Sequence, residues 1–163
     1  MFRLFEGWVK TTAVPAAAEP PPGLIDAVGG KAQFVGRSKF DFLIEVDNEA
    51  AVRGLEPDMT AIARVAARGV IVTSRGNGKT KYDFVSRFFA PQAGVPEDPV
   101  TGSAHCALAP YWAAKLGKNE LAAFQASPRG GELRLRLVGD RVKIGGQAVT
   151  VLRGELTTDN LGA

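Results

Sequence analysis

One helical segment limits what this chain can fold into. Residues 103–116, "SAHCALAPYWAAKL", are apolar at nearly every position, and only His105 and Lys115 are conspicuously polar after the first residue. A helix that is apolar all round must be surrounded by protein. We expect Pro110 to bend this helix or loosen one turn, and Gly117 to end it. The rest of the chain therefore has to cover every side of the helix.

The segments that follow this helix have the pattern of an antiparallel sheet. In "ELRLRLV", residues 132–138, leucines alternate with charged residues, so one face of the strand is apolar and the other is exposed to solvent. Turns at "PRGG" and "GD" join this strand to one strand before it, in 121–127, and one after it, in 141–156. The predicted fold class is α+β, an antiparallel β-roll wrapped around one central apolar helix.

The first part of the chain predicts a terminal strand, a linker and then short alternating elements. A strand is expected over 2–10, and the Ala/Pro-rich stretch 13–23 predicts a semi-extended linker. Residues 1–23 are thus a strand and linker, and 24–163 form one lobe. Within the lobe, the patterns predict helices over 24–28, 47–55 and 57–69, the last with Asp58 as its N-cap, and strands over 40–46, 70–74 and 81–90, the last of them half-buried.

Composition narrows the function classes. The net charge is only +3, from 20 basic and 17 acidic residues, which is a weak case for nucleic acid. We interpret the cations of the last hairpin as a solvated face: Arg129, Arg134, Arg136, Arg141 and Lys143. No stretch is long and uncharged enough to span a membrane. The single cysteine, Cys106, excludes an intramolecular disulfide framework and favours a cytoplasmic location. His105 and Cys106 lie side by side without a further ligand cluster, so no metal site is predicted.

The loop before the apolar helix, "GVPEDPVTGS", is the strongest candidate for a functional site. The first turn of a helix presents unpaired N–H groups at the positive end of its dipole. Asp98, Thr101 and Ser103 add polar side chains, and Gly102 leaves the backbone open to close approach. The pattern fits a binding place for a carboxylate or similar anion. A structural alternative is that Asp98 and Thr101 simply cap a buried helix.

The segment "PEDPVTGSAH" resembles the signature of the phenazine-biosynthesis (PhzF-like) isomerase family, relatives of diaminopimelate epimerase. The similarity extends over roughly residues 22–156, through "FVSRFFAPQAG" before the signature and "RGGELRLRL" after it. It implies one lobe of a two-lobed fold, in which two β-rolls with central helices enclose a cleft. It also implies cofactor-free proton transfer on a small carboxylate-bearing metabolite. Asp98 would orient the substrate, with Gly102 and Ser103 donating to its carboxylate. Thr101 and His105 complete the expected substrate-binding set.

The resemblance covers only the C-terminal lobe of the family. The glutamate credited with proton transfer belongs to the other lobe and has no counterpart in this sequence. Activity would therefore need a homodimer or a separate partner lobe. Two alternatives stay open, namely a catalytically silent anion-binding or interaction module and a truncated gene product. Cys106 is expected to pack as a small apolar residue and not to act as an acid or base.

Overall fold

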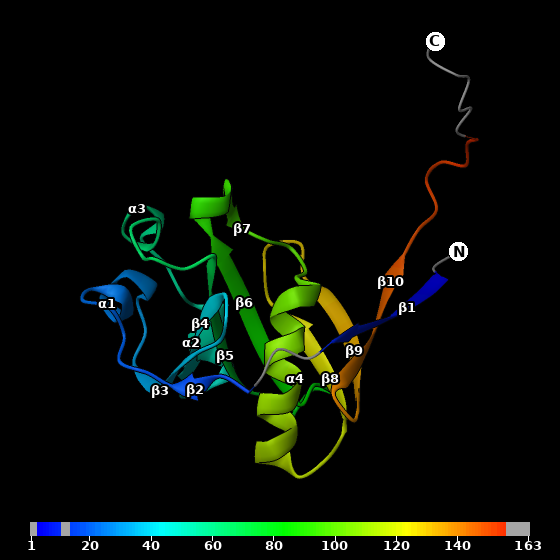
Figure 1. Cartoon of the computed structure of the whole chain (residues 1–163), viewed down its shortest axis with the longest axis horizontal. Coiled ribbons are helices and arrows are strands. Elements are labelled where there is room, and N and C mark those ends of the chain that lie inside the picture. The colour runs from blue at the N-terminus through cyan, green and yellow to red at the C-terminus, as the bar shows by residue number, and fades with distance from the viewer. Residues whose placement is uncertain (1–2, 11–13, 156–163) are drawn as a thin grey trace, which may run out of the picture.

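A computed structural model of the chain describes residues 3–10 and 14–155. The strands are β1 (Arg3–Lys10), β2 (Ala16–Ala17), β3 (Ala32–Arg37), β4 (Asp41–Val46), β5 (Gly69–Arg75), β6 (Phe84–Ala90), β7 (Val95–Glu97), β8 (Glu120–Gln125), β9 (Gly131–Val138) and β10 (Arg141–Ala148). The helices are α1 (Leu24–Val28), α2 (Glu49–Arg53), α3 (Met59–Ile62) and α4 (Gly102–Leu116). Within the described residues all the strands join one sheet, in the order β1-β10-β9-β8-β6-β5-β4-β3-β2, with β7 beside β6 (Figure 1).

The sheet is mixed, so the prediction of a purely antiparallel sheet is wrong. β4 pairs with β5 in parallel, and β6 pairs with β8 in parallel. Parallel neighbours require a crossover connection, and each of these two connections contains helix. α2 and α3 lie between β4 and β5, while α4 lies between β6 and β8. The predicted antiparallel meander over β8, β9 and β10 is confirmed, although its last strand, predicted within 141–156, ends at Ala148.

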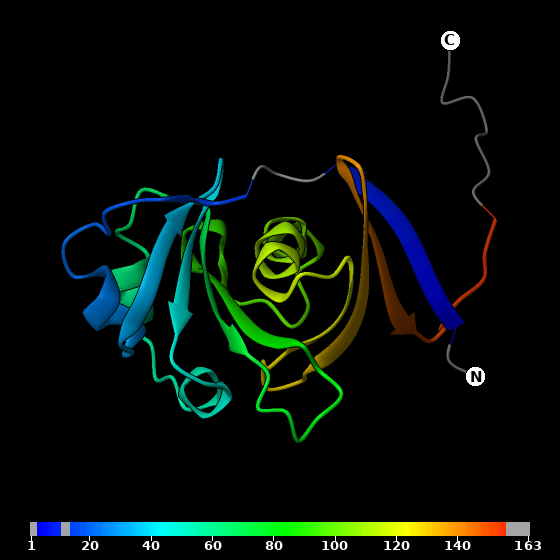
Figure 2. The same cartoon turned by 90° about the horizontal axis from the view of Figure 1, so that it is seen from below.

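Helix α4 lies on the concave side of this sheet. Figure 2 views it end-on, with strands on both sides and below it. Most of the helix between Ala104 and Ala113 is buried, and it continues through Pro110. The fully buried Leu108 and the nearly buried Trp112 belong to a core that the central strands and the β8–β10 meander share. The apolar composition of the helix thus agrees with its burial, since other parts of the chain cover most of its surface.

The opposite face of the central strands is covered by α1, α2 and α3, which build a second apolar core. In β6, Phe88 belongs to the α4 core and Phe89 to the second core. All seven residues of β6 are therefore buried. The prediction of a half-buried strand over 81–90 is wrong because helices cover both faces of this strand.

Two short helices begin at side-chain N-caps, and both are shorter than the predicted ranges 47–55 and 57–69. The predicted N-cap Asp58 is confirmed, whereas Asn48 was not named from the sequence. Asn48 accepts from the Ala51 N–H at 2.9 Å at the start of α2. Asp58 accepts from the Ala61 N–H at 3.0 Å at the start of α3. The helix predicted over 57–69 ends at Ile62, since from Arg64 onward the bonds reach back only two or three residues and the Arg68 N–H donates to Phe40 O.

The first part of the chain contributes strands at both ends of the strand order. β1 pairs with β10 from Arg3↔Ala148 to Lys10↔Arg141. The short strand β2, within the predicted linker, pairs with β3. Phe2, the first residue of the predicted N-terminal strand, lies outside the described residues. No helix in the described ranges is long and apolar enough to cross a membrane.

Candidate functional site

The N-terminal end of α4 is open to the surface. Gly102 and Ser103 are exposed, whereas Ala104 behind them is buried. Thr101 occupies the N-cap position, but its side chain makes no capping hydrogen bond. The Asp98 carboxylate is instead bound by the Thr101 hydroxyl. The interpretation of Asp98 and Thr101 as helix caps is therefore wrong, and the first-turn N–H groups keep their need for an acceptor.

Gly102 is not required by the fold in the described chain. Its φ is not positive, so its backbone conformation is open to any residue. A Cβ added at this position would meet no atom within 4 Å. Glycine in a helix is less stabilising than alanine by about 0.5–1 kcal/mol. A glycine with neither a conformational nor a packing reason leaves the backbone of the helix tip accessible from outside.

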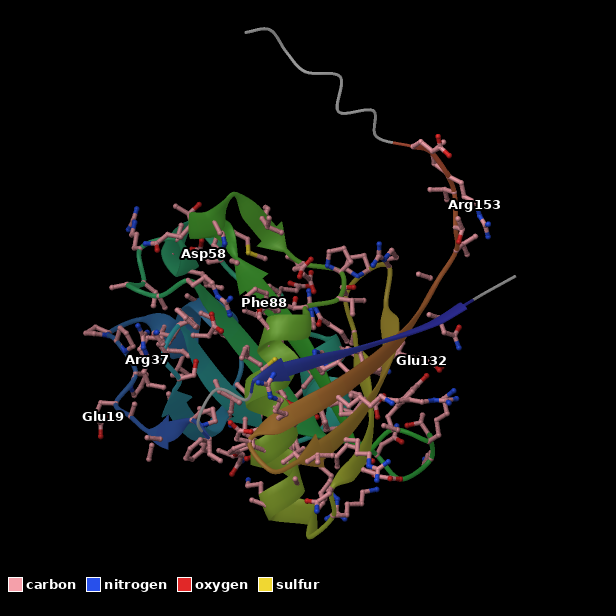
Figure 3. All side chains as sticks on the ribbon, turned by 45° about the vertical axis from the view of Figure 1, so that its right-hand side comes forward. Glu19, Arg37, Asp58, Phe88, Glu132 and Arg153 are labelled. Carbon is pink, nitrogen blue, oxygen red and sulfur yellow. The ribbon has the colours of Figure 1, made fainter. Side chains whose placement is uncertain are left out.

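Asp98 lies between the last strand before the loop and the start of α4. Its N–H donates to Phe88 O at 3.0 Å, which ties the loop to β6, where Phe88 is labelled in Figure 3. Its Oδ2 accepts from the Thr101 hydroxyl at 2.5 Å. Within residues 14–155, no group donates to the second carboxylate oxygen, Oδ1. The side chain is partly exposed, so this oxygen is the one available to a ligand.

Gln125, which the sequence patterns did not single out, holds this loop from the end of β8. Its side chain is fully buried. Its Oε1 accepts from the Thr101 N–H at 2.8 Å, and its Nε2 donates to Asp98 O at 2.6 Å and to Thr101 Oγ1 at 3.1 Å. Nearby, the Ser127 hydroxyl donates to Pro99 O at 2.8 Å. Nothing local in the sequence marks Gln125, since its partners lie more than twenty positions earlier.

A buried ion pair holds the strand that leads into the loop. Arg87 donates to both carboxylate oxygens of Glu97, at 2.7 and 2.9 Å. The same guanidinium donates to Leu55 O at 2.8 Å. Because both side chains are mostly buried, the pair is shielded from solvent. The loop is thus fixed at its start by Arg87 and at its end by Gln125.

A pocket of about 880 Å³ borders the helix tip. Its lining includes Val100, Gly102, residues 129–133 and residues 144–149. The pocket forms where pairing between β9 and β10 stops, while β10 continues beside β1. The two strands separate there, which leaves a hollow walled largely by glycine backbone and apolar side chains.

Among the residues whose side chains the structure describes, two charged residues line this pocket, Arg129 and Glu132. Glu132, labelled in Figure 3, accepts from Lys81 at 2.7 Å and from the Tyr82 hydroxyl at 2.5 Å. These hydrogen bonds lower the pKa of Glu132, and the ammonium group of Lys81 pairs with its negative charge. Arg129 is exposed, as predicted for a solvated face, and it also lines the pocket beside the helix tip, to which it brings positive charge.

His105 lies beneath the helix tip and not at its surface. The side chain is fully buried, stacks on Phe84 at 6.0 Å between ring centroids, and donates from Nδ1 to Thr101 O at 2.8 Å. Burial lowers the pKa of His105 to about 4, against the opposing effect of the bond to Thr101. A buried ring of this kind supports the loop, and it is not placed to contact a ligand at the exposed tip.

Cys106 is also structural in its placement. It is buried, and its thiol donates to Gly102 O at 3.4 Å. Burial raises the pKa of the Cys106 thiol, so the thiolate needed for acid–base work is disfavoured. In the described parts of the chain, no group of three or more His, Cys, Asp or Glu side chains could hold a metal ion.

Comparison with known proteins identifies the family. The family model PhzC-PhzF, "Phenazine biosynthesis-like protein", matches residues 26–154. The chain belongs to this family. The matched range contains the loop, the whole of α4 and the Gln125 strand.

Relatives and solved structures of the PhzC-PhzF family agree with this assignment. An "uncharacterized isomerase" of Halalkalibacterium halodurans is 54% identical over 136 residues, which are 83% of this chain and 51% of the relative. Another, from Pseudomonas aeruginosa, is 59% identical over 114 residues, which are 70% of this chain and 42% of the relative. The crystal structure of a putative phenazine biosynthesis PhzC/PhzF protein from Clostridium difficile superposes with a TM-score of 0.82 at 35% identity, covering 94% of this chain and 58% of that one. The chain thus spans about half the length of the curated relatives that it matches.

Acidification is expected to destabilise the fold through His105. Because burial lowers the pKa of His105 from 6.5 to about 4, the unfolded chain takes up the proton before the folded one does. This contribution to stability is complete above about pH 6.5 and is lost as the pH falls towards about 4. Between pH 7 and pH 5 the free energy of unfolding should fall by about 2 kcal/mol from this group.

A matched variant separates His105 from the carboxylates that also titrate. His105→Asn retains a side-chain N–H for Thr101 O but does not ionise in this range. Urea unfolding at pH 7 and at pH 5 measures the free energy of unfolding of the wild type and of the variant. The wild type should lose more stability than the variant, and equal losses would show that the folded state does not hold His105 in its neutral form.

Proposed function

We propose that this chain is one β-roll lobe of an epimerase-like isomerase, and that the tip of α4 binds the carboxylate of a small metabolite. The observation that carries the proposal is Gly102, an exposed helix-start glycine with no conformational or packing reason in the described chain. It stands beside uncapped N–H groups and a pocket that contains Arg129. Membership of a family whose relatives are called isomerases supports the same reading.

The residues at the tip divide the binding of such a metabolite between them. The N–H groups of Gly102 and Ser103 donate to the carboxylate, which the positive end of the helix dipole and Arg129 also attract. Asp98 accepts, through Oδ1, from an amino or hydroxyl group on the neighbouring carbon. Thr101 and His105 support the loop from inside, so their part in binding is indirect. The reaction proposed is proton transfer at a carbon next to the carboxylate, without a cofactor.

Epimerisation at that carbon removes a proton from one face and delivers one to the other, and Asp98 is one carboxylate at one face. We place the second group on a facing lobe, supplied by a second copy of this chain or by a separate partner. Val149 lines the pocket and is 51% exposed, and Val151 and Leu152 follow it in the chain with exposed fractions of 92% and 83%. Exposed apolar side chains of this kind favour association. The cytoplasmic location stays a prediction.

We expect a homodimer in solution. A second copy that covers the apolar residues next to the pocket would bring two helix tips towards one another. Light scattering at high micromolar concentration measures the mass directly. A mass of twice 17.2 kDa agrees with the homodimer. A monomer would contradict it and would favour the alternative of a catalytically silent anion-binding module.

Gly102→Ala should weaken binding while leaving the fold intact or slightly more stable. The added methyl meets nothing in the chain, and replacing a helical glycine by alanine stabilises by up to about 1 kcal/mol. The same methyl would stand where a bound carboxylate approaches the backbone. Calorimetric titration with succinate should show affinity about tenfold lower for the variant than for the wild type.

The control is a substitution at a glycine away from the tip that the fold tolerates equally well. Gly146 is suitable for the comparison, since a Cβ there would meet its nearest atom only at 4.0 Å and its φ is not positive. It lines the pocket on the β10 side, so Gly146→Ala tests whether any added methyl in the pocket has the same effect. Unchanged succinate affinity in Gly102→Ala would contradict carboxylate binding at the helix tip.

A further inference from the structure

We propose that Gln125 is a positioning residue that, through the Thr101 hydroxyl, determines which oxygen of Asp98 faces a ligand. Gln125 is fully buried at the end of β8 and touches both ends of the stretch 98–101. Its amide bonds to Asp98 O, Thr101 N and Thr101 Oγ1 at 2.6, 2.8 and 3.1 Å. The inference rests on the proposed function in that it assigns a role to Asp98 at that site.

Two backbone groups fix the orientation of the Gln125 amide. The Thr101 N–H can only donate, so the atom facing it at 2.8 Å must be the oxygen Oε1. Asp98 O can only accept, so the atom facing it at 2.6 Å must be the nitrogen Nε2. Turning the amide over would break both bonds inside a buried site, where an unsatisfied polar group costs about 1–3 kcal/mol. The amide therefore presents its N–H groups to Asp98 O and to Thr101 Oγ1.

This orientation sets the direction of the Thr101 hydroxyl. Nε2 is the donor in its contact with Thr101 Oγ1, so the hydroxyl oxygen accepts there. The hydroxyl has a single proton, which is then directed to its other neighbour, Asp98 Oδ2, at 2.5 Å. The three groups form a chain of hydrogen bonds with one direction, from Gln125 Nε2 through Thr101 Oγ1 to Asp98 Oδ2.

As a consequence, the two carboxylate oxygens of Asp98 have different roles. Oδ2 is held by Thr101, and Oδ1 has no donor among residues 14–155. Oδ1 is thus the oxygen that accepts from a ligand hydroxyl or amino group. Because the same Gln125 amide holds the Thr101 N–H just before Gly102, one side chain also fixes the distance between Asp98 and the helix tip.

The test uses three variants of the whole chain. Thr101→Val keeps the size of the side chain and both backbone bonds of Gln125 but removes the hydroxyl. Thr101→Ser keeps the hydroxyl and is its matched control. Gln125→Met removes the amide, and if this variant fails to fold, the Thr101 pair still decides. Each is titrated with succinate and with L-malate, which differs from succinate by one hydroxyl next to a carboxylate.

In the wild type and in Thr101→Ser, L-malate should bind more tightly than succinate by about fivefold, as one added hydrogen bond to Oδ1 predicts. Thr101→Val should lose this preference while its succinate affinity changes by less than about twofold, since both backbone bonds of Gln125 remain. Gln125→Met should lose the preference too, with a lower affinity for both acids because it also releases the Thr101 N–H and Asp98 O. A residue that only stabilised the fold would change the affinities for both acids together. A malate preference that survives in Thr101→Val and Gln125→Met would overturn the inference.

A second readout does not depend on ligand binding. In proton NMR spectra of the free wild type, the Thr101 hydroxyl proton should exchange slowly and show a nuclear Overhauser effect to the Asp98 side chain. Gln125→Met should speed its exchange. A fast-exchanging hydroxyl in the wild type, or one unaffected by Gln125→Met, would overturn the chain of hydrogen bonds. If neither acid binds but the hydroxyl behaves as expected, the proposed function fails and the positioning of Asp98 by Gln125 stands.

Discussion

The burial of α4 against the concave side of the sheet is the interaction on which the rest of the structure depends. Leu108 and Trp112 are buried in a core shared with β5, β6, β8 and β9, so the helix cannot shift without opening that core. Large apolar side chains in such positions contribute several kcal/mol each, of the order of 2–5. The packing stops at Ala104, and Gly102 and Ser103 stand outside it. The buried part of α4 is thus held rigidly in the core, and it fixes the position of the exposed first residues of the helix.

The parallel pairing of β6 with β8 connects this core to the candidate site. The chain leaves β6, forms the loop, runs through α4 and returns beside β6 in β8, where Ser86 is opposite Gln125. The return places Gln125 next to the loop that began the crossover. Asp98 is therefore bound on one side by Phe88 O from β6 and on the other by Gln125 from β8. The geometry of the loop follows from the register of two strands and not from the loop sequence alone.

Local patterns were sufficient to predict the apolar helix, the N-cap Asp58, and the meander of β8, β9 and β10. They did not predict the features that depend on pairing between distant segments. These features are the two parallel strand pairs and the burial of β6 on both faces. The sequence also singled out the loop as the candidate site, which stays a prediction, but it did not single out the residues that support the loop. Gln125 is one of two polar residues in β8, and only its partners 24 and 27 positions away reveal its role. His105 in turn is buried because Phe84 packs over it, which no helical period indicates.

The central claim is that the uncapped tip of α4 receives a carboxylate. Mapping backbone amide shifts of the isotopically labelled chain during addition of succinate tests it most directly. The account predicts that the largest changes fall on Gly102, Ser103 and Ala104, since hydrogen-bond donation to a carboxylate alters those amides first. Changes centred elsewhere on the chain, with these three amides unaffected at saturation, would contradict it.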